Sequence, residues 1–203
     1  MAALLHLIAH SEGKKEKAKF RLYTSSMDRQ PIYRQVLRSE FDRLAPELKS
    51  FHGVCGSARF RGKCRIESAT SPIGRFLCWL LDLPKAANDA EFVFELDASA
   101  TDETWRRHFP DRTMRSTMQV ADGLLVERIG PVRLWFALSV ESGRLVMRLA
   151  RFSVFGLPWP SALMPEVWGD ERGSAGVLHF DVGARLPAIG LLASYNGSLV
   201  IDP

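Results

Sequence analysis

Apolar and polar residues alternate over most of the chain beyond Gly53, and this period of two predicts β-strands. The alternation is strongest from Val132 to Val140, where every second side chain is large and apolar. Turn signals at Asp122-Gly123 and Ser142-Gly143 separate neighbouring segments of this kind. The expected strands are residues 57–67, 92–97, 105–109, 112–121, 124–129, 132–140, 144–154, 177–186 and 191–201. The pattern therefore predicts about eight or nine strands.

Two segments in the N-terminal half have helical spacing instead. Asp28 can cap a first helix, Pro31 is tolerated in its first turn, and Pro46 interrupts it before a short continuation that ends at His52-Gly53. A second helix is expected from Ile73 to Leu83. The apolar residues that carry this spacing are Ile32, Val36, Leu37, Phe41, Leu44, Leu48 and Phe51 in the first segment and Ile73, Phe76, Leu77, Leu80 and Leu81 in the second.

The order of these elements predicts an α+β fold. Its core is expected to be a mainly antiparallel curved sheet or a partial β-barrel of about 8–9 strands, because short turns rather than helical crossovers join the strands. The corner from Gly156 to Pro160 leads to a short turn that ends at Pro165, and Asn196-Gly197 is a hairpin signal between or within the last two strands. A curled sheet needs a filled interior, so either a helix or a ligand cavity is expected inside it.

The first 26 residues differ in character from the rest of the chain. Met27 stands directly before the first helix signal, so we expect residues 1–26 to be a flexible N-terminal extension and residues 27–203 to be a single domain. With 46% apolar residues, the chain has ample material for one continuous core.

The charge balance argues against nucleic acid as a partner. The 27 basic and 23 acidic residues give a formal charge of +4, and most of them are scattered evenly. The basic stretch from Lys14 to Arg21 is typical of a solvated tail. No apolar segment is long enough to be a transmembrane segment, and three cysteines without a Cys-x-x-Cys pair predict a cytoplasmic protein.

Catalytic signatures are absent, which favours a non-catalytic role. The sequence contains no P-loop, no Gly-x-Gly-x-x-Gly, no Gly-x-Ser-x-Gly and no His-Glu-x-x-His. The candidates for a general acid or base are His52, at the end of the first helical segment, and Glu127. His52 would alternatively donate to the last helix carbonyls. No metal site and no cofactor are predicted.

Charged residues inside otherwise half-buried strands are the more informative feature. Buried charges need partners, so Glu127 is expected to pair with an arginine of a neighbouring strand, while the alternative places such residues on a solvated face. Glu127 and Arg128 are adjacent in a strand, so at most one of them can be a core ion. The candidate ligand-binding residues are Arg107, Arg115, Ser116, Glu127, Arg128, Trp159 and Tyr195.

From about Ile32 to its end, the chain resembles the bacterial family known as domain of unknown function 4166. The matching segments are Tyr33 to Leu44, Phe51 to Gly53, Trp105 to Phe109, Arg115-Ser116, Gly123 to Arg128, Gly130-Pro131, Gly156 to Pro160, Phe180 to Val182, Pro187, Gly190, Tyr195 and Gly197. The resemblance implies no activity. It implies a context, because such domains stand alone, follow a saccharopine-dehydrogenase-like nucleotide-binding domain, or are attached to membrane segments.

The residues and the resemblance together leave three hypotheses. The first is a binding module for an apolar small molecule or a protein partner, in which Glu127, Arg128, Arg115 and His52 orient the ligand. The second is an enzyme, or an accessory subunit that acts with a separate NAD(P)-dependent reductase such as a saccharopine-dehydrogenase-like protein. The third is a peripheral membrane module in which Trp159, Trp168 and Phe155 insert and the basic tail assists.

Overall fold

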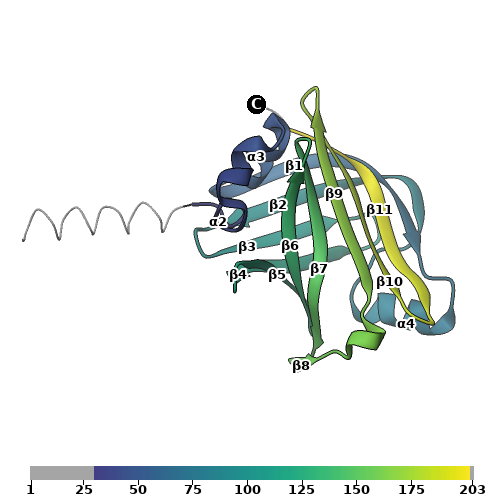
Figure 1. The fold of residues 1–203 in the computed structure, drawn as a ribbon. Helices are drawn as coiled ribbons and strands as arrows, with labels where there is room; N and C mark the ends of the chain where they lie inside the picture. The colour runs from purple at the N-terminus through teal and green to yellow at the C-terminus, as the bar shows by residue number, and fades with distance from the viewer. Residues whose placement is uncertain (1–29, 202–203) are drawn as a thin grey trace, which may run out of the picture. The chain divides into compact units, whose positions relative to one another are not determined.

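Ten antiparallel strands close into a barrel in the computed structural model, which describes residues 30–201 (Figure 1). The strands follow one another around the barrel in chain order, and β11 pairs back onto β1. The short strand β8 pairs only with β7 and stands outside the ring. The elements are α2 (Ile32–Leu37), η1 (Arg38–Arg43), α3 (Pro46–His52), β1 (Gly56–Ser68), α4 (Pro72–Leu80), β2 (Ala87–Ala98), β3 (Asp102–His108), β4 (Thr113–Ala121), β5 (Leu124–Ile129), β6 (Val132–Glu141), β7 (Arg144–Val154), β8 (Leu157–Pro158), η2 (Ser161–Leu163), β9 (Glu166–Ser174), β10 (Val177–Leu186) and β11 (Gly190–Val200).

The antiparallel α+β architecture is confirmed, but the expected number of strands is too low. Counting β8, the described residues form eleven strands, and the two that the sequence pattern missed are β8 and β9. In β9 the inward positions include Gly169, Glu171 and Gly173 instead of large apolar residues, so the strand shows no apolar alternation. Gly169 leaves room for the Met147 side chain, and Gly173 leaves room for Glu47.

The predicted N-terminal helix is divided into three pieces. Arg38 has a positive φ of 53°, which ends α2 and starts the 3₁₀ turn η1, and α3 follows after Ala45. Pro31 occupies the N-cap position of α2, and the predicted cap Asp28 lies outside the described residues, as does the expected extension 1–26. The second predicted helix is confirmed as α4, which ends three residues earlier than expected at Leu80.

The two predicted hairpin turns at Asp122-Gly123 and Ser142-Gly143 are present, each with positive φ at both residues. The signal at Asn196-Gly197 is wrong, because both residues lie inside β11. Gly197 is needed there for a different reason. A side chain at this position would collide with the backbone of Lys63 and with Cys64 on β1, so the glycine permits close packing at the seam where the barrel closes.

The N-terminal helices and α4 lie at opposite ends of the barrel (Figure 1). Helix α3 packs Phe51 against Phe60 and Phe94, which face inward from β1 and β2. The amide of Ala45 donates to the carbonyl of Gly143. These contacts make α2 and α3 a plug for one end of the barrel. Among the described helices, none is long and apolar enough to cross a membrane.

Candidate ligand cavity

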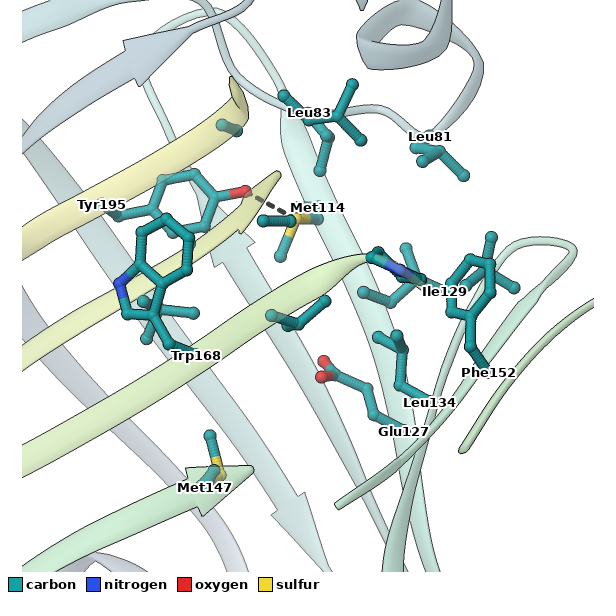
Figure 2. Close-up of a pocket in the computed structure, with 18 of the residues that line it drawn as sticks. Leu81, Leu83, Met114, Glu127, Ile129, Leu134, Met147, Phe152, Trp168 and Tyr195 are labelled. Atoms are coloured by element: carbon teal, nitrogen blue, oxygen red, sulfur yellow. Dashed lines mark hydrogen bonds between the residues drawn. The ribbon is translucent and has the colours of Figure 1, made fainter. Parts of the chain in front are cut away.

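A cavity of about 530 Å³ occupies the barrel interior. Its walls are almost entirely apolar and come from the inward faces of the strands (Figure 2). Phe51 of the plug contributes to one end. Leu77 of α4, Leu81 just after it and Trp159 of the β8–β9 connection contribute to the other. The volume lies in the range that small-molecule sites occupy. The curled sheet is thus closed at one end by a helix and left hollow behind it.

Three charged side chains line this apolar space, namely Arg107, Glu127 and Glu171. The Glu127 carboxylate points into the cavity from β5 (Figure 2). Arg107 Nη2 lies 3.4 Å from Glu127 Oε1, and both side chains are only about one-tenth exposed. The single arginine on the lining is therefore already paired with a carboxylate.

The Arg107 side chain is fixed on several sides. Its Nη1 donates to Ser116 Oγ at 3.1 Å, and its guanidinium carbon lies 4.8 Å from the Trp105 ring centroid and 5.5 Å from that of Phe94. Cation–π contacts of this kind gain strength when water is excluded. Strand β4, which carries Ser116, lies between β3 with Arg107 and β5 with Glu127.

Glu171 connects the cavity to the plug. Its Oε2 lies 2.6 Å from His52 Nε2, and both side chains are buried. A carboxylate accepts hydrogen bonds, so Nε2 carries the proton, and Nδ1 of His52 has no partner among the described residues. The Tyr33 ring lies over the His52 ring with a centroid distance of 3.8 Å. His52 is covered by this stack and is not among the cavity-lining residues.

A third acid, Glu103, lies beside this group on β3. Its Oε2 accepts a hydrogen bond of 2.9 Å from Trp105 Nε1. Burial raises the pKa of Glu103, against the opposing effects of the Trp105 hydrogen bond and of His52. Burial is also the main cause that raises the pKa of Tyr33, with Glu171 and Glu103 adding to it. Burial therefore favours the uncharged forms of Glu103 and Tyr33.

Tyr195 brings a hydroxyl into the cavity from β11 (Figure 2). Its only described hydrogen-bond acceptor is the thioether of Met114, at 3.7 Å. Burial raises the pKa of Tyr195, so the hydroxyl keeps its proton. A thioether is a weak acceptor, which leaves this donor available to a better one.

The structure places five of the predicted ligand-binding residues at the cavity and two away from it. Arg107, Glu127 and Tyr195 line the cavity, and Ser116 accepts a hydrogen bond from Arg107. Trp159 lies at the cavity end near α4 and stacks edge-on against Phe152. The other two, Arg115 and Arg128, are exposed on the outer face of the barrel.

Glu127 and Arg128 point to opposite faces, as their adjacency in a strand requires. The partner of Glu127 is an arginine, as expected, but it comes from β3 rather than from the adjacent strand β4 or β6. His52 donates to Glu171 rather than to the helix carbonyls. The described residues contain no group of three His, Cys, Asp or Glu side chains arranged to hold a metal ion.

Three buried polar residues of the interior were missed by sequence reasoning. Glu103 could have been found, because it shares the inward face of β3 with Trp105 and Arg107 at a spacing of two. Glu171 gave no such signal, since glycines flank it at the inward positions of β9. Tyr33 was counted only as part of the first helix.

A family model described as "Domain of unknown function (DUF4166)" matches residues 44–199. Among curated proteins, no relative matches the chain. A solved structure titled "Crystal Structure of Rv2717c from M. tuberculosis" is similar, with a TM-score of 0.42 and 16% sequence identity, over 79% of this chain and 99% of that one.

Proposed function

The chain belongs to the DUF4166 family of domains of unknown function, and we propose that its barrel binds an uncharged apolar small molecule. The cavity carries this proposal, because a space of about 530 Å³ with almost purely apolar walls excludes strongly hydrated ligands. Burying the apolar part of a ligand in it releases on the order of 25 cal/mol for each Å² removed from water.

The charges on the lining indicate that the ligand is uncharged. A ligand carboxylate would find Arg107 already neutralised by Glu127, and it would also lie near Glu171. A buried charge without a partner costs several kcal/mol, so a fatty acid is disfavoured. A ligand hydroxyl would instead donate to the Glu127 carboxylate, and a ligand carbonyl would accept from the Tyr195 hydroxyl. We therefore expect a long apolar molecule with one such group.

The first test identifies any small molecule that co-purifies with the protein. The full chain is purified from cells, measured by native mass spectrometry and extracted with organic solvent. We expect a defined lipophile without a carboxylate or phosphate. A protein that is always empty and takes up no lipophile when offered one would contradict the proposal.

A matched pair of ligands tests the specificity. Hexadecanol and hexadecanoic acid differ only at the head group, and each is titrated against the protein loaded with the neutral fluorophore Nile red. We expect the alcohol to displace the fluorophore at least tenfold more efficiently than the acid. The Glu127→Gln variant frees Arg107 from its counter-ion, so its preference should move toward the acid.

Arg148→Gln is the control for that variant, because Arg148 is largely exposed and lies outside the cavity. Its preference should equal that of the unchanged protein. If Glu127→Gln and Arg148→Gln both leave the alcohol-to-acid ratio unchanged, Arg107 and Glu127 do not contact the head group. If neither ligand displaces the fluorophore from any of these proteins, the cavity is not a lipophile site.

A further inference from the structure

Large apolar side chains are exposed around the cavity end opposite the plug. We call this surface the portal rim and define it as Ile73, Phe76, Trp79 and Leu80 of α4 with Phe155, Leu157 and Leu163 of the segment between β7 and β9. Both segments lie at the same end of the barrel (Figure 1). Trp79 is 65% exposed and Phe155 is 78% exposed. Eight of the nine large apolar residues that are exposed among the described residues belong to these two segments, the eighth being Trp159.

Helix α4 is apolar on both faces. Leu77 and Leu80, together with Leu81 just after the helix, line the cavity, while Ile73, Phe76 and Trp79 are exposed on the other side. Its only ionisable charge is Arg75. A helix that is apolar all round is normally buried on both sides, so the outer face of α4 lacks a partner in the isolated chain. The second segment, residues 155–165, contains no charged residue at all.

Four basic residues beside the rim form no ion pair among the described residues. Arg128 and Arg133 lie directly opposite each other on β5 and β6 and form no ion pair among the described residues. The turn between them contacts the rim, because the Phe155 amide donates to the carbonyl of Pro131. Arg75 and Lys85 at this end are also without an ion pair within residues 30–201. Like charges placed opposite each other destabilise a sheet, which points to an external anion.

The acidic residues at this end are fewer and partly compensated. Asp111 pairs with Arg112 at 3.2 Å, and Glu166 lies opposite Arg185 in the register of β9 and β10. Asp82 follows α4 and has no ion pair within the described part of the chain. At the plug end, Arg43 pairs with Glu40 at 2.6 Å, whereas Arg38 is exposed and has no ion pair among the described residues. What distinguishes the rim is that unpaired positive charge and a large exposed apolar surface occur together there.

We propose that the portal rim docks onto an anionic lipid bilayer. Its apolar side chains would enter the acyl boundary, and Arg75, Lys85, Arg128 and Arg133 would contact the phosphates. A second copy of the chain is a poorer occupant, since a symmetric contact would place the same unpaired cations against each other. The cavity ends at this surface, so a bound lipophile could pass between barrel and bilayer without crossing water.

The test is co-sedimentation of the full chain with vesicles. Vesicles of phosphatidylcholine alone are compared with vesicles of phosphatidylcholine mixed with phosphatidylglycerol, at low and at high salt. We expect binding to the mixed vesicles that salt weakens. Arg128→Gln with Arg133→Gln should lose roughly fivefold in vesicle affinity for each charge removed. Lipids brominated on their acyl chains should quench tryptophan fluorescence, and Trp79→Ser should remove part of this quenching.

The apolar part of the rim is tested by the double change Phe76→Ser and Trp79→Ser. Both side chains are exposed, so the barrel should keep its thermal stability while vesicle binding falls at least tenfold. Val200→Ser is the matched control, because Val200 is the exposed large apolar residue at the plug end of β11, 53% exposed. That variant should bind vesicles as the unchanged protein does.

Three outcomes would overturn the docking proposal. The protein could fail to sediment with either kind of vesicle, or the double variant could bind as well as Val200→Ser, which would place the contact elsewhere on the chain. The double variant could also abolish a dimer seen by sedimentation equilibrium without changing vesicle binding, which would make a second copy the occupant. Hexadecanol binding in the absence of vesicles is measured on the same variants, so a failure of docking is separable from a failure of the proposed ligand site.

Discussion

At the scale of single residues, the barrel interior keeps acids neutral or paired. Glu103 shows this most clearly, because burial raises its pKa and its only described hydrogen bond comes from Trp105. A carboxyl whose pKa is raised on folding contributes its full stability below the ordinary pKa of glutamate and loses it as pH rises through the folded-state pKa. Ionisation of Glu103 should therefore cost stability toward neutral pH.

The Glu103→Gln variant removes that cost and keeps an acceptor for the Trp105 N–H group. We expect its melting temperature to exceed that of the unchanged protein at neutral pH, and the difference to shrink to zero at acidic pH, where both side chains are uncharged. Circular dichroism melts across the pH range measure this. A variant that is less stable than the unchanged protein at neutral pH would show that the carboxylate is stabilising.

Arg107 and Glu127 should behave as one unit. Arg107→Met leaves Glu127 without its partner among the described residues, so the free energy of unfolding should fall by about 3 kcal/mol. Adding Glu127→Met removes the orphaned charge and should restore most of that loss. Urea denaturation of both single variants and the double variant completes the cycle. Strictly additive losses would mean that the two side chains do not interact energetically.

At the scale of elements, alternation predicts a strand only where the barrel needs large inward side chains. Strands β2 and β6 point Phe92 and Phe136 inward and were predictable. Strand β9 points Gly169 and Glu171 inward, so its sequence resembles a loop. Gly169 leaves space for the Met147 side chain, and Glu171 is the hydrogen-bond partner of His52. The apolar pattern along one strand does not record which side chains the neighbouring elements place against it. Asn196-Gly197 was misassigned as a turn for the same reason, because Gly197 is required by its contacts with β1.

Gly197 provides a test of the seam between β1 and β11. Gly197→Ala adds a methyl group against the Lys63 backbone and Cys64, so the free energy of unfolding should fall by about 2 kcal/mol. The neighbouring Asn196→Ala is the control and should change it by less than about 0.5 kcal/mol, because Asn196 is exposed. Guanidinium denaturation measures both. Equal effects would show that the seam can separate to accept a side chain.

At the scale of the whole molecule, the sequence predicted the antiparallel sheet and the hairpin turns at Asp122-Gly123 and Ser142-Gly143, but not the closed barrel. Closure depends on β11 returning to β1 across most of the chain, which no local pattern encodes. Arg107 and Glu127 could be selected as charges in half-buried strands, yet their meeting across β4 depends on the curvature of the barrel. The sequence left open whether a helix or a cavity fills the sheet, because this depends on where α3 docks.

The two ends of the barrel should differ in local stability. The plug buries Ile32, Tyr33 and Leu48 completely, whereas α4 buries only Gly74 and Cys78. Regions with little buried apolar surface open locally at low free energy. Native-state hydrogen exchange should therefore show α3 amides exchanging near the global unfolding free energy and α4 amides exchanging several kcal/mol below it.

Anionic vesicles supply the missing partner for the outer face of α4, so adding them should slow exchange in α4 and leave α3 unchanged. Slow exchange in α4 without vesicles would mean that the helix is a fixed wall of the cavity, and a lipophile would then need another route into the barrel. Fast exchange that vesicles slow would make α4 the movable part of the barrel, at the position where both the cavity and the unpaired positive charges reach the surface.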